Sequence, residues 1–358
     1  MRTVVVTGAA GEVGRRVLER LAARSDVDRL IAVDVRPGSL EANGVEWHIL
    51  DLSRPAGTPD AFEEWVAGAD VIHLAWVDPQ AASQAAEANR MILERVLGAM
   101  ARTGGEPRVM VHLSSGTVYG AWPDNPVPLS EDVPLRPNPE FTYATTKAEA
   151  EREVAEWADD HPEVAVSILR PSVVVGAASQ PLYQALGGTR LARTDEGGRR
   201  VQYLHVDDLA SAVVFAWDGG LSGVYNVAPD RGTGEATARA LAGGVAQVAL
   251  PARLAHALAD WSWHLVGDGV PKEAQAYARH PWVLAPDRLR DMGWVAEYSS
   301  EEALVATDNR SHWDDLPPGK RQEFTLLVGV GGLVLAVAAA SGAVLGVRRR
   351  GVRRRAGA

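Results

Sequence analysis

Two side chains suited to moving a proton stand four residues apart in the run Tyr143-Ala144-Thr145-Thr146-Lys147. Residues 143–157 predict a helix, and positions i and i+4 of a helix share one face. An ammonium beside a phenol lowers the pKa of the phenol, so Tyr143 could exchange a proton with a substrate oxygen. The alternative is a surface pair without a chemical role, because this spacing occurs by chance in many helices.

A hydroxyl-rich segment, Ser114 to Gly120, follows a predicted strand at residues 109–114. Ligands of parallel α/β sheets bind at the carboxyl ends of the strands, where this segment is expected to lie. A hydroxyl there can hydrogen-bond the reacting oxygen of a substrate and orient it towards Tyr143. Ser115 is the candidate, so the predicted catalytic set is Ser115, Tyr143 and Lys147.

A glycine-rich loop lies between the first predicted strand and the first predicted helix. The spacing of its glycines lets the backbone turn sharply and approach a pyrophosphate, which the N-terminus of the helix then faces. The loop predicts a dinucleotide site, and the residues expected to contact the cofactor are Gly8, Ala10, Gly11, Glu12, Val13 and Gly14.

Asp34 ends the second predicted strand. A carboxylate there can accept hydrogen bonds from both hydroxyls of the adenosine ribose and repels a 2′-phosphate, which favours NAD over NADP. Arg36 nearby would soften this preference. The alternative for the loop and the carboxylate together is an ordinary glycine turn next to a surface aspartate.

The elements that must position these residues alternate between strands and helices. Short apolar runs predict strands, and apolar residues at helical spacing predict helices. The predicted strands span residues 3–7, 30–35, 45–50, 71–75, 109–114 and 164–169, and the predicted helices span 15–24, 81–101 and 143–157. This alternation predicts an α/β fold with a doubly wound parallel sheet covered on both faces.

The pattern loosens after about residue 170, where glycine, proline and tryptophan become frequent. We therefore predict a dinucleotide-binding domain at residues 1–170 and a smaller substrate lobe at 171–310. The rest of the chain is expected to comprise a polar linker at 311–323, an uncharged segment at 324–347 and a basic tail at 348–358.

The uncharged segment 324–347 is long enough to cross a hydrocarbon core of about 30 Å, at a rise of about 1.5 Å per residue. We predict one C-terminal transmembrane helix; the alternative is a buried core helix. Ala338, Gly342 and Gly346 recur at every fourth position, so two such helices could pack closely, and a homodimer is considered.

Orientation in the membrane poses a conflict. Six arginines follow the segment and would place the tail in the cytoplasm by the positive-inside rule. A single crossing would then leave the cofactor domain outside, although Met1 to Gly8 is not expected to be a signal peptide. We expect a cell-membrane protein with its catalytic domain on the cytoplasmic face. The tail is then translocated, or the segment re-enters at Gly331-Gly332.

Charge and composition exclude some function classes. The formal net charge is -10, of which the six tail arginines contribute +6, so the rest of the chain carries -16. An acidic body argues against nucleic acid as a partner, because phosphate binding needs a basic face. The chain has no cysteine, so disulfides, thiolate nucleophiles and cysteine-ligated metals are excluded, and no metal site is predicted.

The order and spacing of the motifs resemble the extended short-chain dehydrogenase/reductase family, specifically its NAD-dependent epimerase/dehydratase branch. The resemblance spans roughly residues 3–300 and implies a Rossmann-like sheet, a small C-terminal substrate lobe and NAD as cofactor. The motifs that carry it are Thr7–Gly14, Asp34, Asp51-Leu52, His73-Leu74-Ala75, Asn89, Ser114–Gly120, Tyr143–Lys147, Leu169-Arg170-Pro171 and His205–Ala210.

The resemblance also implies roles for individual residues. It places Asp51 and Leu52 near the adenine, Ala75 along the cofactor and Pro171 in the cofactor site. The catalytic triad that it implies is Ser115, Tyr143 and Lys147, of which the last two also contact the cofactor.

The chain departs from the family at three places. Dehydratases carry an Asp-Glu pair where Gly116 and Thr117 stand, so 4,6-dehydration is not expected. Sugar-nucleotide epimerases bind the substrate diphosphate with an Asn where Val173 stands. They also use an Arg just before the His-Val-x-Asp motif, whereas Arg199 and Arg200 lie one residue out of register.

We therefore predict an NAD-dependent epimerase or dehydrogenase that acts on a small molecule with a secondary alcohol or ketone. A nucleotide sugar is the substrate that the family implies. A 3β-hydroxysteroid or another lipophilic alcohol is the alternative, motivated by the apolar run Val173–Val175 and the membrane segment. An alternative of another class is a non-catalytic NAD-binding regulatory protein, although such relatives typically lose the Tyr or Lys.

Overall fold

The protein is described by a computed structural model that divides into two units, Met1–Thr307 and Asp308–Ala358. The predicted linker, transmembrane helix and basic tail all fall in the second unit, outside the described residues. In the part that is described, no helix is long and apolar enough to span a membrane. The described residues are 2–38, 44–55, 61–77, 84–102, 108–176, 192–193, 200–234, 237–238, 241, 248–249, 276–277 and 280–306.

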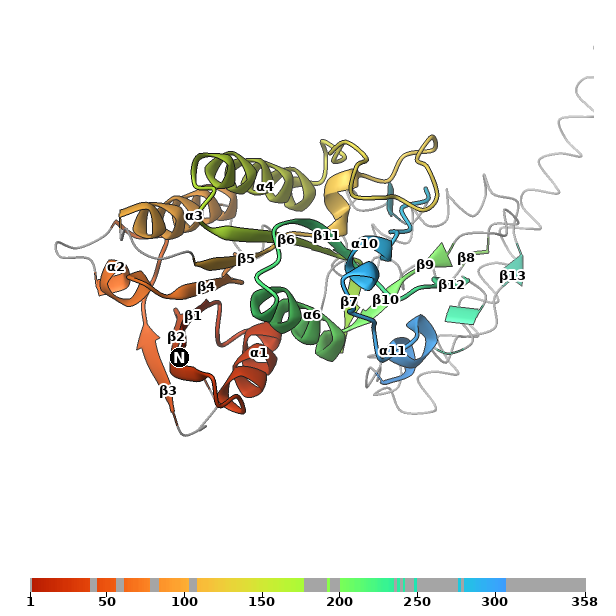
Figure 1. The fold of residues 1–358 in the computed structure, drawn as a ribbon. Helices are drawn as coiled ribbons and strands as arrows, with labels where there is room; N and C mark the ends of the chain where they lie inside the picture. Colours follow the sequence, from red (N-terminus) through yellow and green to blue (C-terminus); the bar gives the residue numbers. More distant parts are fainter. Residues whose placement is uncertain are drawn as a thin grey trace, which may run out of the picture. The chain divides into compact units, whose positions relative to one another are not determined.

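A seven-stranded parallel sheet organises the first unit, with the strand order β11-β6-β5-β4-β1-β2-β3 (Figure 1). The order reverses at β1, which makes the gap between β1 and β4 a topological switch point, where α/β sheets bind ligands. The strands are β1 (Arg2–Thr7), β2 (Val27–Asp34), β3 (Val45–Ile49), β4 (Asp70–His73), β5 (Val109–Leu113), β6 (Ala165–Pro171) and β11 (Gly223–Val227).

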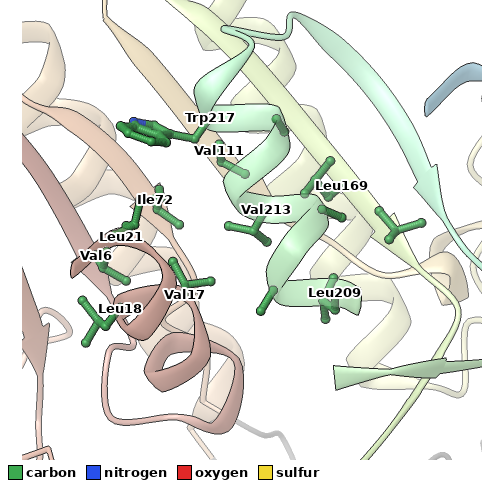
Figure 2. Close-up of a cluster of buried hydrophobic side chains, with 14 of the residues drawn as sticks. Val6, Val17, Leu18, Leu21, Ile72, Val111, Leu169, Leu209, Val213 and Trp217 are labelled. Atoms are coloured by element: carbon green, nitrogen blue, oxygen red, sulfur yellow. The ribbon is translucent and has the colours of Figure 1, made fainter. Parts of the chain in front are cut away.

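Helices cover both faces of the sheet, as predicted. One face carries α1 (Glu12–Ala22) and α6 (Val206–Asp218), and the other carries α2 (Ala61–Val66), α3 (Ala85–Arg102) and α4 (Thr142–Asp160) (Figure 1). Successive strand residues point to opposite faces, so Val4 and Val6 join the core under α1 and α6, whereas Val5 joins the other core. Figure 2 shows the first core, with Val17, Leu18, Leu21, Leu209, Val213 and Trp217.

The predicted strands and helices are present, with shifted ends. The first helix begins at Glu12, three residues earlier than predicted, directly after Gly11. The strand predicted at 71–75 ends at His73, so Ala75 lies in the loop that follows β4. The Rossmann-like α/β class with a parallel sheet is confirmed.

Elements from beyond residue 170 complete the sheet domain and begin the lobe. The strand β11 pairs with β6, and α6 packs against α1. Both elements lie within the range predicted for the lobe but belong to the sheet domain. The remaining elements are η1 (Gly116–Tyr119), β7 (Val173–Val175), β8 (Ala192–Arg193), β9 (Arg200–Val201), β10 (Tyr203–His205), β12 (Thr233–Gly234), β13 (Val248–Ala249), α10 (Asp287–Asp291) and α11 (Ser300–Ala306).

Three small pairings belong to this outer part. The strand β7 pairs in parallel with β10, and Val175 lies opposite His205. The strand β12 pairs with β9 in antiparallel fashion, and β13 pairs with β8 in parallel. A third apolar core lies here and includes Val173, Tyr277 and Leu284.

Candidate functional site

The predicted site residues gather at the carboxyl edge of the parallel sheet. The backbone register aligns Thr7 with His73, and Leu113 with Leu169, so the loops after β1, β4, β5 and β6 leave the sheet at the same edge. This edge therefore brings together the glycine loop, Ala75, Ser115 and Pro171.

The glycine loop has the shape that a dinucleotide requires. Gly8 adopts a left-handed φ of +70°, and a Cβ built there would lie 2.6 Å from the backbone nitrogen of Ala75. The Gly11 amide donates to the Gly8 carbonyl at 3.1 Å, and α1 begins at the next residue. A Cβ on Gly14 would lie 2.3 Å from the Gly8 carbonyl oxygen. Glycine is thus needed for the turn and for the close packing of α1 on the loop.

Asp34 ends β2 beside this loop, as predicted. Its carboxylate accepts hydrogen bonds from the Ala10 amide at 3.0 Å and the Arg36 amide at 3.1 Å. The Arg36 guanidinium is largely exposed, with its Nε 3.9 Å from the carboxylate. The negative charge is therefore fixed next to the loop, while the neighbouring cation extends towards solvent.

The residues that the family resemblance assigns to the cofactor follow the same edge. The Asp51 carboxylate accepts from the Ser53 hydroxyl at 2.6 Å, and this bond holds the pKa of Asp51 below its usual value. Leu52 is buried. The Ala75 amide donates to the Thr7 hydroxyl at 3.4 Å, which places Ala75 against the glycine loop. Pro171 is buried at the end of β6.

Lys147 is buried on α4, and its Nζ donates to the Leu113 carbonyl at 2.7 Å. The ammonium also lies 3.6 Å from the centre of the Trp76 ring, an attractive cation–π contact. Burial lowers the pKa of Lys147 to about 7, against the opposing effect of Glu151. In the protein without cofactor, the ammonium is thus the main form below pH 7 and is lost as the pH rises through that value.

Tyr143 lies one helical turn before Lys147 on α4 and is half-buried. Its ring contacts Trp76 edge-on, with centroids 6.3 Å apart, and Phe141 at 5.7 Å. Trp76 therefore contacts both members of the predicted acid–base pair. The spacing of Tyr143 and Lys147 in the sequence predicted that they share one helix face. The contacts with Trp76 and Phe141 orient the Tyr143 phenol.

Ser115 is the N-cap of η1, and its Oγ accepts from the Thr117 amide at 3.2 Å and the Thr117 hydroxyl at 2.9 Å. These bonds fix the side chain at the end of β5, one residue after Ser114. The hydroxyl hydrogen of Ser115 can still be donated to an incoming oxygen.

Two buried histidines lie on the sheet beneath this site. His73 and His112 are paired in register on β4 and β5, with ring centroids 5.5 Å apart. The His73 Nδ1 bonds the Thr7 hydroxyl at 2.8 Å. Burial and the Lys147 charge lower the pKa of His73 to about 3, and burial lowers that of His112 as well. Both rings are therefore neutral at physiological pH.

The run Val173–Val175, which motivated a lipophilic substrate, belongs to the protein core instead. Val173 and Val175 pack in the third apolar core and Val174 in the first. Successive side chains of β7 point to opposite faces of the strand, and both faces are buried. All three positions are therefore apolar. Arg200 donates to the Gly232 carbonyl at 3.1 Å, and Arg199 lies outside the described residues.

Three residues close to the candidate catalytic set were given no role from the sequence. Trp76 covers Lys147, and Glu151 and Arg170 form a buried ion pair next to it. Arg170 stood in a recognised motif, and Glu151 follows Lys147 by another four positions, so both carried a signal. Trp76 had none, because its contact depends on how the loop after β4 folds.

The fold and the loop geometry define a dinucleotide-binding α/β protein. The sequence profile of the NAD dependent epimerase/dehydratase family matches residues 4–228, which is more than half of the chain. The chain therefore belongs to the NAD-dependent epimerase/dehydratase family, and NAD is its cofactor.

Two curated relatives are 27% and 29% identical to this chain over the aligned residues. An uncharacterized protein of Mycobacterium tuberculosis is 27% identical over 245 residues, which cover 64% of this chain and 62% of the relative. The chain thus spans less than two thirds of that protein. The GDP-6-deoxy-D-mannose reductase of Pseudomonas aeruginosa is 29% identical over 237 residues, covering 62% of this chain and 73% of the reductase.

Solved structures show the same fold. The UDP-glucose 4-epimerase of Thermus thermophilus in complex with NAD has a TM-score of 0.61 at 23% identity, covering 86% of this chain and 98% of the epimerase. A short-chain dehydrogenase/reductase superfamily protein of Agrobacterium tumefaciens with bound NAD has a TM-score of 0.63 at 23% identity, covering 88% and 99%. At these identities the likeness concerns the fold.

Proposed function

We propose that the chain is an NAD-dependent epimerase or dehydrogenase acting on a secondary alcohol or ketone. The observation that carries the proposal is the position of Lys147, whose buried ammonium is held on the Leu113 carbonyl one turn of α4 from Tyr143. A buried cation next to a half-buried phenol, at a sheet edge where ligands bind, suits acid–base chemistry.

The residues at the sheet edge fit NAD. Gly8 and Gly14 let the loop turn and pack closely where a Cβ would meet backbone atoms, the N-terminus of α1 follows the loop, and the Asp34 carboxylate can accept hydrogen bonds from the ribose hydroxyls. Asp51, Leu52, Ala75 and Pro171 are proposed to line the remaining cofactor site. When bound, NAD takes a hydride from a substrate carbon or returns one.

The catalytic roles follow from the positions of three side chains. Tyr143 gives or takes the proton of the substrate oxygen. The Lys147 ammonium favours the charged phenolate and can bind the nicotinamide ribose. Ser115, fixed as the cap of η1, donates a hydrogen bond to the same oxygen and orients it towards Tyr143.

A nucleotide sugar is the substrate class that we propose first, supported by the family and by the nucleotide-sugar reductase among the relatives. A lipophilic alcohol such as a 3β-hydroxysteroid is the second candidate. It is favoured by the absence of the diphosphate-binding Asn of epimerases, since Val173 stands at that position, and by the engagement of Arg200 with the Gly232 carbonyl. Dehydration is not proposed, because Gly116 and Thr117 replace the acid pair.

The test is a substrate screen with the full chain. The purified protein is first examined for retained NAD, and then incubated with NAD or NADH and a panel of nucleotide sugars and 3β-hydroxysteroids. NADH absorbance reports dehydrogenation, and chromatography of the sugars reports epimerisation. Bound NAD without turnover of any compound would favour the non-catalytic alternative, and failure to bind NAD would contradict the proposal.

Cofactor preference is expected to follow from Asp34. NAD should bind at least about tenfold more tightly than NADP, because the carboxylate repels a 2′-phosphate and loses its ribose hydrogen bonds. Calorimetric titration with both cofactors measures the ratio. Asp34→Asn keeps a hydrogen-bond acceptor but removes the negative charge, so it should reduce the ratio of NAD affinity to NADP affinity. Equal or tighter binding of NADP by the natural chain would refute the assignment.

Membrane attachment through residues 324–347 is also proposed, with the catalytic domain on the cytoplasmic face. The support is the uncharged length of this segment and the presence of NAD in the cytoplasm. The small residues Ala338, Gly342 and Gly346 are proposed to let two copies pair within the bilayer.

Deletion of residues 324–358 is expected to move the protein from the membrane fraction to the soluble fraction while NAD binding persists. Deletion of 348–358 alone is the matched control, since it removes the arginines but keeps the apolar segment. A full-length protein found wholly in the soluble fraction would contradict the anchor. Protease added to intact spheroplasts tests the orientation, which would be wrong if the catalytic domain were digested.

A further inference from the structure

Glu151 is a buried carboxylate on α4, one helical turn beyond Lys147. One of its oxygens, Oε2, accepts the Ser114 hydroxyl at 2.7 Å, and both oxygens accept from the Arg170 Nε, at 2.9 and 3.2 Å. The proposed acid–base chemistry does not use this group. Tyr143, Lys147 and Glu151 occupy successive turns of one helix face.

Arg170 extends the contacts of Glu151 across the molecule. Its Nη1 donates to the Tyr119 hydroxyl at 2.5 Å, and that hydroxyl donates to the Asn226 side chain at 2.9 Å. Asn226 in turn donates to the carbonyls of Leu129 and Ala285. The ion pair therefore joins α4, η1, β6 and β11 around the end of β5.

Stability alone is a weak reason for such an arrangement. Removing two charges from water costs free energy that their attraction does not fully return, and apolar replacements of buried ion pairs are often equally stable. Here the pair is bonded to Ser114, which lies between two functional positions. Leu113 supplies the carbonyl that binds Lys147, and Ser115 is the proposed substrate-orienting hydroxyl.

Among the described residues, Glu151 is the negative charge that acts on Lys147. His73 on β4 and His112 on β5 face the ammonium as neutral rings, because burial lowers the pKa of each. Trp76 offers a ring face, and Tyr143 lies on the same helix. Glu151 opposes the loss of the Lys147 proton that burial causes.

We propose that Glu151, clamped by Arg170 and Ser114, is a positioning residue that keeps Lys147 charged and holds the end of β5 in place. This inference rests on the proposed function, because it assigns Glu151 a part in that site. In this role Glu151 binds Arg170 and Ser114 and is not assigned a contact with substrate or cofactor. It acts through the charge of Lys147 and through the backbone that carries Leu113 and Ser115.

The chain offers a direct measurement, because it has only three lysines, Lys147, Lys272 and Lys320. Full-length protein labelled with 13C at the lysine ε-carbon gives three sets of signals, and Lys147→Arg identifies the one that belongs to Lys147. Titration of this signal gives the pKa of Lys147 without substrate or turnover. Absence of NAD binding by the natural chain would count against the proposed function and would leave this titration readable.

Glu151→Gln is expected to lower the Lys147 midpoint by about one pH unit or more, because it removes the charge that opposes the effect of burial on Lys147. Asp70→Asn is the matched control. It removes another buried carboxylate that binds an arginine, Arg2 at 2.8 Å, at the opposite end of the sheet. This control should reduce the melting temperature and leave the Lys147 midpoint unchanged.

An uncompensated Arg170 can unfold the single variant, so the double variant Glu151→Gln/Arg170→Met is measured as well. Its Lys147 midpoint should still fall, because the opposing electrostatic effect on Lys147 comes from Glu151. A folded variant of either kind with an unchanged midpoint would overturn the proposal. Failure of both variants to fold would assign the pair to stability alone and would overturn it too.

Discussion

Tyr143→Phe is expected to leave NAD bound and to reduce turnover of the true substrate by about 10²- to 10⁴-fold, because this is the usual contribution of a positioned acid–base group. The variant keeps the ring that packs against Trp76 and Phe141, so the site should retain its shape. It removes only the oxygen that carries the proton. Turnover with the substrate found by screening, together with calorimetric titration of NAD, separates the two effects.

Tyr225→Phe is the control for this experiment. Its hydroxyl donates to the Ser222 carbonyl at 2.9 Å, at the edge strand β11 and away from the glycine loop. Removing that hydroxyl should leave turnover unchanged. Near-normal activity of Tyr143→Phe would show that another group moves the proton. Loss of NAD binding in the same variant would show that Tyr143 is needed to hold the cofactor.

Gly8→Ala is expected to abolish NAD binding and to destabilise the sheet domain. The added Cβ would meet the Ala75 nitrogen at 2.6 Å and the carbonyl carbon of Leu74 at 2.7 Å, and both are backbone atoms that cannot rotate away. The loop after β1 must therefore move, and the space for a pyrophosphate moves with it. Thermal unfolding and NAD titration measure the two consequences.

Gly68→Ala provides a closely matched comparison. Gly68 has a φ of +68°, nearly that of Gly8, but a Cβ built there meets nothing within 4 Å. The left-handed backbone alone should cost about 1–2 kcal/mol in the free energy of unfolding. NAD affinity should stay unchanged. If both alanine variants lost similar stability and both bound NAD, the close approach of Gly8 to Ala75 would not be needed for NAD binding.

The sheet could be predicted from the sequence because its signals are local. A run such as Val4 to Val6 is apolar throughout, as a strand buried on both faces requires. The position of Asp34 at the end of a strand and the shared face of Tyr143 and Lys147 follow from spacing alone. These features depend on neighbours in the chain, which a single sequence displays.

Contacts between distant segments could not be predicted in the same way. Trp76 lies in the loop that follows β4 and Arg170 lies on β6. Each contacts a residue of α4 only once the fold has brought these elements together. The recruitment of β11 to the main sheet is of the same kind, since nothing in the run Gly223 to Val227 indicates that it pairs with β6. The apolar run at Val173 suggested a ligand surface because a strand in the protein core and a surface that binds a lipophilic ligand both consist of apolar residues.

The pairing of β7 with β10 has a consequence for how the lobe can change in evolution. Val175 ends β7, and Tyr203, which pairs with Val173, begins β10, so the chain between them starts and ends on two neighbouring, paired strands. The entropy of closing such a loop grows only slowly with length, by about 0.6 kcal/mol for each doubling. Insertions between these strands would therefore cost the sheet little stability. New substrate-contacting segments can be tried there while the cofactor half keeps its structure.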